Sequence, residues 1–331
     1  MFLLRRLAHH LVLVAAAASL GYLLAAAALD PRAGFEDRAP RPPDAVIDAR
    51  LSALNLNDRV PLADRYLTWA DGVLHGDFGR TWDGVPVNGE LWRRLGVSLR
   101  LVAPGAVLGG VLGVALGAFA AARCGRAADR LISLGSFLLL ATPVFVLAVL
   151  LQIAATGAND AMGARVFVWV GESTPEVSGF GALTDRARHL LLPSATIMLA
   201  QLALYCRYQR GLMLDVLNAA FVRTARAKGL PRRRALLRHG LRTALIPLTT
   251  YFSYASGLLL LGAVFTEKIF GWHGLGEWLV DSVTRGDVNA VAAIDCVAAC
   301  TVLLAGLTAD ALNLVLDPRI RTGAPVPGLA S

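Results

Sequence analysis

Long uncharged apolar runs alternate with polar segments along the whole chain. Runs without any Asp, Glu, Lys or Arg cover residues 11–29, 101–122, 131–158, 190–206 and 243–266. A sixth run, residues 290–316, is apolar apart from Asp295 and Asp310. About 20 apolar residues cross a bilayer as a helix, and these runs are too long and continuous for barrel strands. The pattern therefore predicts an all-α integral membrane protein with six transmembrane helices.

The overall composition agrees with this fold class. Of the 331 residues, 56% are hydrophobic and only 17% are charged, whereas soluble domains carry about 25% charged residues. The four cysteines form no CxxC pair and no cluster with histidine. We therefore expect no metal site and no disulfide framework.

The basic residues are concentrated in alternate connections between the runs. Residues 207–242 carry ten Lys and Arg against Asp215 alone, and the N-terminal end, the loop after the second run and the C-terminal end are also basic. Residues 30–94, 159–189 and 267–289 are near neutral or acidic. By the positive-inside rule, both termini and residues 207–242 are expected in the cytoplasm. The net charge of +8 is then mainly a topological signal, and no nucleic-acid partner is expected.

The longest outer segment, residues 30–94, opens with several prolines and continues with several glycines. This composition indicates an extended, loose connection that either caps the mouth of a pore or serves as a linker.

Four glycines repeat at every fourth position in the second apolar run, at Gly105, Gly109, Gly113 and Gly117. Such a face lets another helix backbone approach closely in a membrane. The sequence predicts a packing seam, and leaves open whether its partner helix belongs to this chain or to another subunit.

Motifs of membrane enzymes and of self-contained pumps are absent from the sequence. It has no GxxxxGK[ST] phosphate loop, no HExxH and no histidine in the middle of a span, so neither ATP hydrolysis nor another enzymatic activity is expected of this chain. Asp295 and Asp310 lie within about two turns of the ends of the sixth run. An interfacial or packing role and a proton relay both remain open for them.

The segment from residue 207 to 242 interrupts the apolar pattern with a dense basic stretch. Residues from Tyr208 to Lys228 favour a helix, and Gly229 follows as a C-terminal glycine would. Pro231 is placed for the first turn of a second helix over residues 232–242. Two interpretations are open, a solvated basic face near anionic lipid or a docking element for a partner.

The basic stretch contains "RTARAKGL" and "RHGLRTALIPL", which resemble the cytoplasmic loop of ABC-importer permeases of the dipeptide, oligopeptide and nickel class. Further stretches resemble the same family in the same order, namely "GDFGRTW", "TPVFVLAVLLQ", "EKIFGWHGLGEWLVDSVTRGD" and "ALNLVLDPRIR". The first permease subunit of peptide systems is the most similar type. The loop pattern of the wider family has a glutamate and a final proline that this chain lacks.

This resemblance implies a type I importer permease, with residues 1–331 as one permease domain in the cell inner membrane. It implies a second permease subunit, one or two cytoplasmic ATPases that bind ATP and Mg²⁺, and an extracytoplasmic substrate-binding protein. Residues 30–94 would form the outer segment, and residues 207–242 the loop that couples to the ATPases. This chain would bind no cofactor itself.

The resemblance also implies roles for individual residues. The residues expected in the ATPase-coupling loop are Arg223, Thr224, Ala225, Arg226, Lys228, Gly229 and His239. The polar residues expected in the translocation path are Gln201, Ser253, Tyr254 and Ser256, for which hydrogen bonds between helices are an equal alternative. Peptides are the expected substrate, with nickel or another small solute as alternatives. An ATP-independent carrier would instead depend on Asp295 or Asp310.

Overall fold

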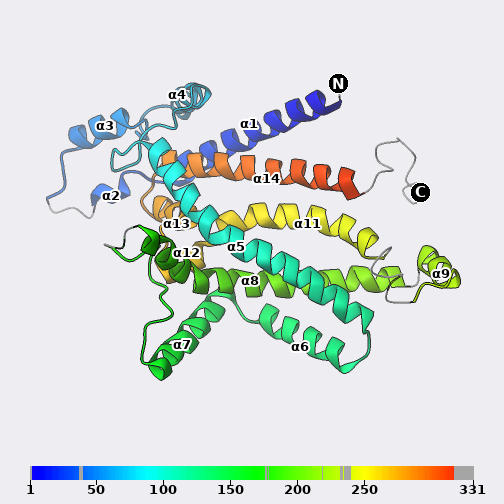
Figure 1. Cartoon of the computed structure of the whole chain (residues 1–331). Helices are drawn as coiled ribbons and strands as arrows, with labels where there is room; N and C mark the ends of the chain where they lie inside the picture. The colour runs from blue at the N-terminus through cyan, green and yellow to red at the C-terminus, as the bar shows by residue number, and fades with distance from the viewer. Residues whose placement is uncertain are drawn as a thin grey trace. The chain divides into compact units, whose positions relative to one another are not determined.

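The protein is helical almost throughout the part that the structure, a computed structural model, describes (Figure 1). This part comprises residues 2–36, 40–175, 177, 179–217, 219–231, 234 and 240–316, with the backbone alone for residues 2–8, 180, 256, 260 and 261. The helices are α1 (Phe2–Ala28), α2 (Ala33–Glu36), α3 (Asp44–Ala53), α4 (Leu62–Leu74), α5 (Val87–Ala122), α6 (Ala127–Ala141), α7 (Val144–Met162), α8 (Phe180–Leu217), α9 (Ala220–Ala227), α11 (Leu241–Gly262), α12 (Val264–Phe270), α13 (Leu275–Thr284) and α14 (Val288–Leu316).

The described helices provide six candidate membrane spans when the bent pair α11 and α12 is counted as one, and six is the predicted number. Helices α1, α5, α7, α8 and α14 are each long and apolar enough to cross a membrane. The sixth candidate is the pair α11 and α12, whose axes differ by 48° at a short break. The predicted span over residues 243–266 is therefore bent where one continuous helix was expected.

The predicted third span, residues 131–158, is divided in two. Helix α6 ends at Ala141 and α7 begins at Val144, because Thr142 adopts an extended backbone before Pro143. Proline disfavours the helical conformation of the residue before it and cannot donate a backbone hydrogen bond. Only α7, with 19 residues, has the length of a span by itself.

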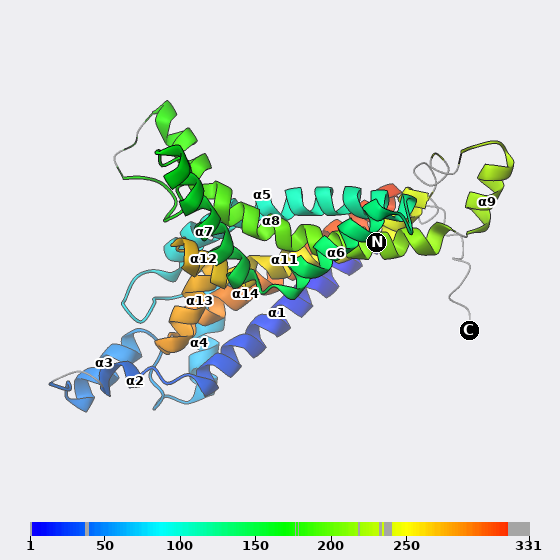
Figure 2. The ribbon, with the colours of Figure 1, turned by 90° about the horizontal axis from the view of Figure 1, so that it is seen from below.

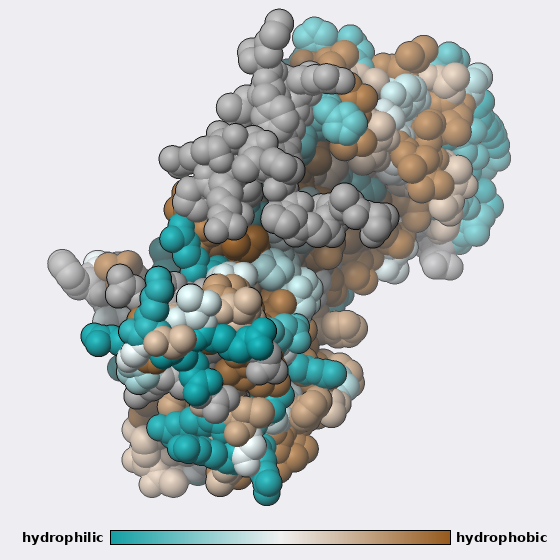
Figure 3. Space-filling view, turned by 90° about the vertical axis from the view of Figure 1, so that its right-hand side faces the viewer, coloured by the Kyte–Doolittle hydropathy of each residue, from teal (hydrophilic) through white to brown (hydrophobic). Residues whose placement is uncertain are grey.

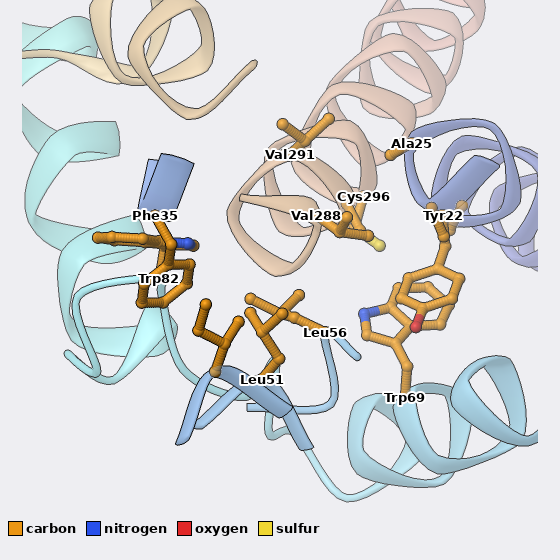
Figure 4. Packing of buried hydrophobic residues seen from close by; sticks show 14 residues of the cluster. Tyr22, Ala25, Phe35, Leu51, Leu56, Trp69, Trp82, Val288, Val291 and Cys296 are labelled. Carbon is orange, nitrogen blue, oxygen red and sulfur yellow. The ribbon is translucent and has the colours of Figure 1, made fainter. Parts of the chain in front are cut away.

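The chain forms two compact units, and the first comprises residues 1–100 and 258–303. Figure 4 shows its main hydrophobic cluster, in which Tyr22 of α1 stacks on Trp69 of α4 with ring centroids 4.5 Å apart. Leu51 of α3 and Leu56 are fully buried in the same cluster. Residues 30–94 are therefore not the loose connection that their prolines and glycines indicated, since their aromatic and aliphatic side chains make a core. The last part of this segment, from Val87 on, already belongs to α5.

The second unit comprises residues 101–257 and 304–331. Helices α5 and α8 run side by side in it, as the views in Figures 1 and 2 both show. A Cβ atom added at Gly109 would lie 2.6 Å from the Met198 carbonyl oxygen, and one added at Gly113 would lie 2.7 Å from that of Leu202. The glycine seam is thus internal to this chain, and it brings the backbones of α5 and α8 into direct contact.

Candidate functional site

The most distinctive site of the second unit is a short basic helix, α9, which lies beyond the end of α8 (Figure 1). The sequence predicted one helix from Tyr208 to Lys228. In the structure α8 ends at Leu217, and Ala219 has an extended backbone from which α9 starts. The interruption lets α9 leave the axis of α8, so that its side chains form a separate surface.

Helix α9 ends in the glycine corner that the sequence predicted. Gly229 has φ +88°, a conformation that side chains disfavour. The Leu230 N–H donates to the Ala225 carbonyl at 3.2 Å, and the Gly229 N–H donates to the Arg226 carbonyl at 3.0 Å. These two bonds form a Schellman motif, which satisfies the last carbonyl groups of the helix. Most of the expected second helix over residues 232–242, including His239, lies outside the described residues. Of this stretch the structure describes Arg234, whose N–H donates to the Pro231 carbonyl at 2.9 Å, and residues 240–242, with α11 beginning at Leu241.

The two faces of α9 differ sharply. Val222 and Ala225 are buried, one turn apart, against Met213 of α8, Ala118 and Ala121 of α5 and Ala244 of α11. The exposed residues of α9 and its C-terminal cap include Phe221, Arg223, Thr224, Arg226 and Lys228. Ala225, which the resemblance placed in the coupling loop, thus contacts its own chain.

Phe221 belongs to the exposed face, with 43% of its surface accessible. The motifs of the sequence do not point to Phe221. Phe221 is exposed because α9 turns a different side, with Val222 and Ala225, toward α5, α8 and α11. The helix therefore presents one large apolar side chain among basic ones, with no acidic residue between Ala220 and Lys228.

The polar residues expected in a translocation path differ in their burial. Gln201 is buried in α8 at the glycine seam, where its Cβ lies 2.7 Å from a Cβ added at Gly109. Ser253 is buried, and its hydroxyl has no hydrogen-bond partner among the described residues. Tyr254 is 44% exposed, and the side chain of Ser256 lies outside the described residues. A role of these residues in a translocation path stays a prediction.

An apolar cavity of about 630 Å³ lies between α5 and α11. Its wall includes Val111 and Phe119 of α5 and Leu245 and Phe252 of α11, with Thr249 as the polar exception. A cavity of this composition offers contact area with few hydrogen-bonding groups.

Asp295 of α14 lies against α1 in the first unit. A Cβ atom added at Gly21 would be only 2.8 Å from its Oδ2 atom, so the glycine provides the space that the carboxyl group occupies. This close packing supports a packing role for Asp295, one of the two roles that the sequence left open. Among the described residues, no group of three or more His, Cys, Asp or Glu side chains could hold a metal ion.

Six candidate spans and an exposed basic helix at the end of one of them are the features of a multi-pass membrane protein with an exposed basic surface. The family model described as "Binding-protein-dependent transport system inner membrane component" matches residues 113–322. The chain belongs to this family, the permease subunits of ABC importers, and is a multi-pass protein of the inner membrane. In this family ATP is bound by partner ATPase chains.

The chain is also similar to curated proteins over most of its length. It is 51% identical to the oligopeptide transport system permease protein OppB of Mycobacterium tuberculosis, over 97% of this chain and 98% of OppB. It is 33% identical to the oligopeptide permease AppB of Bacillus subtilis, over 88% and 87% of the two chains. The dipeptide permease DppB of Escherichia coli is 32% identical over 79% and 81%. These matches confirm the family that the sequence motifs indicated.

Proposed function

We propose that this permease subunit transports peptides, as half of the translocation pathway of an ABC importer. The similarity to OppB over nearly the full length of both chains carries this proposal. The relatives from Bacillus subtilis and Escherichia coli have names that specify oligopeptides and dipeptides. The apolar cavity between α5 and α11 is compatible with a cargo whose side chains vary, because it contains few fixed polar partners.

Uptake of labelled peptides by cells with and without this gene tests the substrate class. Loss of dipeptide or oligopeptide uptake on deletion, with recovery on complementation, is the expected result. Normal peptide uptake combined with loss of nickel or of another small solute would instead support the alternative substrates.

The exposed face of α9 is proposed as the surface that couples transport to the ATPase subunits. The apolar run of α8 ends at Cys206, and the helix continues for eleven further residues, to Leu217. At 1.5 Å per residue this extension is about 16 Å long, whereas each head-group layer is about 5–8 Å thick. Helix α9 would thus lie beyond the lipid head groups, within reach of a soluble partner. Hydrophilic and hydrophobic residues lie side by side on the face of the structure that Figure 3 presents.

The composition of this face specifies a complementary partner surface. Arg223, Arg226 and Lys228 would meet acidic residues, and Phe221 would enter an apolar cleft between them, with Thr224 allowing close approach. Ala225 would support the helix from behind, through its buried contacts. Gly229 would set the direction in which the chain leaves the surface.

Co-purification of the tagged chain with its ATPases tests this assignment. Arg226→Glu should reduce the amount of ATPase that is recovered, whereas Arg165→Glu, a charge reversal at an exposed residue of the loop after α7, should not. Equal recovery from both variants and from Phe221→Ala would contradict the proposed surface.

The complete assembly is proposed to hold a second permease subunit, one or two kinds of ATPase and an extracytoplasmic binding protein. Both termini and residues 207–242 would then be cytoplasmic, and residues 30–94 would face the binding protein. Labelling of intact cells with a membrane-impermeant thiol reagent tests this orientation at Cys124, which is exposed. The proposed topology requires Cys124 to react only after the membrane is opened.

A further inference from the structure

A polar cavity lies between α6 and α8. Helices α6 and α8 enclose a cavity of about 200 Å³ that is separate from the apolar cavity between α5 and α11. Its lining combines cationic and hydroxyl side chains with an aromatic ring, and it comprises Ser133, Ser136, Phe137, Cys206, Arg207, Arg210 and Gly211.

The two arginines of this cavity have different roles. The Arg210 guanidinium donates to both oxygens of Asp129, at 2.6 and 3.0 Å, and the Gly125 N–H donates to the same carboxylate at 2.9 Å. These bonds, chiefly those from Arg210, hold the pKa of Asp129 below its usual value. The charge of Arg210 is thus neutralised within the chain, and this pair ties α6 to α8.

Arg207 keeps its positive charge without such a partner. No carboxylate of the described residues lies within ion-pair distance of it. Its guanidinium carbon lies 4.9 Å from the centre of the Phe137 ring, which positions the cation without neutralising it. Arg207 therefore provides the uncompensated charge at the cavity, and an anion is the complementary ligand.

The location of the cavity favours an anion that is attached to a lipid. Arg207 immediately follows the apolar run of residues 190–206, so its guanidinium lies at the depth where hydrocarbon gives way to head groups. Helix α6 exposes Leu131, Leu134 and Leu138 in an i, i+3, i+7 stripe, with 69%, 56% and 60% of their surfaces accessible. This stripe can contact acyl chains while the head group reaches the cavity.

We propose that the α6–α8 cavity binds the phosphate of an anionic phospholipid. The phosphate oxygens would accept hydrogen bonds from the Arg207 guanidinium and from the hydroxyls of Ser133 and Ser136. The cavity has room for a group of this kind, because its volume of about 200 Å³ is far above the roughly 10–15 Å³ that a single water molecule needs on the same measure. The bound lipid would tie α6 to α8 beside the Asp129–Arg210 pair.

Lipid titration of the full chain, purified with its partner subunits in zwitterionic detergent, tests the proposal. Native mass spectrometry would count bound phosphatidylglycerol and give its apparent affinity, with phosphatidylcholine and inorganic phosphate in parallel titrations. We expect tight binding of phosphatidylglycerol, and about tenfold weaker binding in Arg207→Gln, the effect of one lost charge-assisted hydrogen bond. Arg207→Lys, which keeps the charge, should bind with intermediate affinity.

The control is Arg126→Gln, which removes the same charge from an exposed arginine at the same end of α6 but outside the cavity lining. Equal binding by Arg207→Gln, Arg126→Gln and the unmodified protein would overturn the proposal, as would equal affinities for phosphatidylglycerol and phosphatidylcholine. Competition by millimolar inorganic phosphate at the same site would identify a free-anion site and would equally overturn the lipid assignment. Because both substitutions are at exposed residues, folding of the variants is checked by their elution as the intact complex.

Discussion

The glycine seam between α5 and α8 allows a quantitative test at Gly113. In a Gly113→Ala variant, the new Cβ would lie 2.7 Å from the Leu202 carbonyl oxygen and 2.8 Å from the Tyr205 Cβ. Contacts shorter than 3.4 Å are tight for a Cβ atom, so the two helices must separate by about 0.7 Å, the difference between 3.4 and 2.7 Å. They then lose part of the close backbone contact along the seam.

The expected free-energy change combines two opposing effects. Overpacking of a well-packed site costs about 1–3 kcal/mol, and replacing glycine by alanine within a helix returns about 1 kcal/mol. We therefore expect a net destabilisation of about 0–2 kcal/mol for Gly113→Ala, which is about 1–3 kcal/mol less stable than a Gly→Ala change at an open helix position. Gly113→Leu, whose side chain cannot be accommodated by such a small separation, should prevent stable assembly.

Thermal unfolding in detergent, followed by loss of the monodisperse complex, measures this effect. The matched control is Gly89→Ala in the same helix, where an added Cβ meets no atom within 4 Å. This control should be neutral or stabilising, because only the helix propensity changes. If Gly113→Ala unfolded at the same temperature as Gly89→Ala or above it, the close contact between α5 and α8 would be refuted.

Three further predictions concern other parts of the chain. Gly229→Val should reduce transport several-fold, because a β-branched residue at φ +88° is strained by about 1–2 kcal/mol. Gly229→Asn should keep transport, because asparagine tolerates this conformation. Equal transport rates of the two variants in reconstituted vesicles would contradict this prediction. The lowered pKa of Asp129 means that its ion pair stabilises the protein above the unfolded value of about 3.9 and is lost as the pH falls through the folded value. Asp129→Asn should therefore unfold at a lower temperature at pH 7 and lose this part of the acid sensitivity, and an unchanged pH profile of the melting temperature would argue against it. Trp69→Ala should cost about 3–5 kcal/mol because the ring is buried against Tyr22, while Trp92→Ala at a 66% exposed ring should have little effect on the melting temperature.

The number of spans and the family were predictable from the sequence, because both depend on local patterns. Uncharged apolar runs predict membrane helices, because lipid disfavours exposed polar groups and a helix pairs its own backbone groups. Gly229 could be identified as a helix terminus because the positive φ required there favours glycine. The internal boundaries were less predictable. Pro143 divides residues 131–158, which form one continuous run by hydropathy alone. Pro104, Pro193 and Pro247 lie within helices, so a proline by itself does not show where a helix ends.

The packing partners of the helices could not be predicted from local sequence patterns. A GxxxG face permits close approach to any helix, and only the folded chain assigns it to α8. The same limit applies to residues 30–94. Their prolines and glycines suggested a loose connection, because the hydrophobic cluster around Trp69 and Leu51 needs Tyr22 of α1 to complete it. For α9, the positive charge and the terminal glycine could be read from the residues alone. The tertiary structure decided that Ala225 is buried and Phe221 exposed, because the side of a helix that faces solvent is set by what packs against the other side.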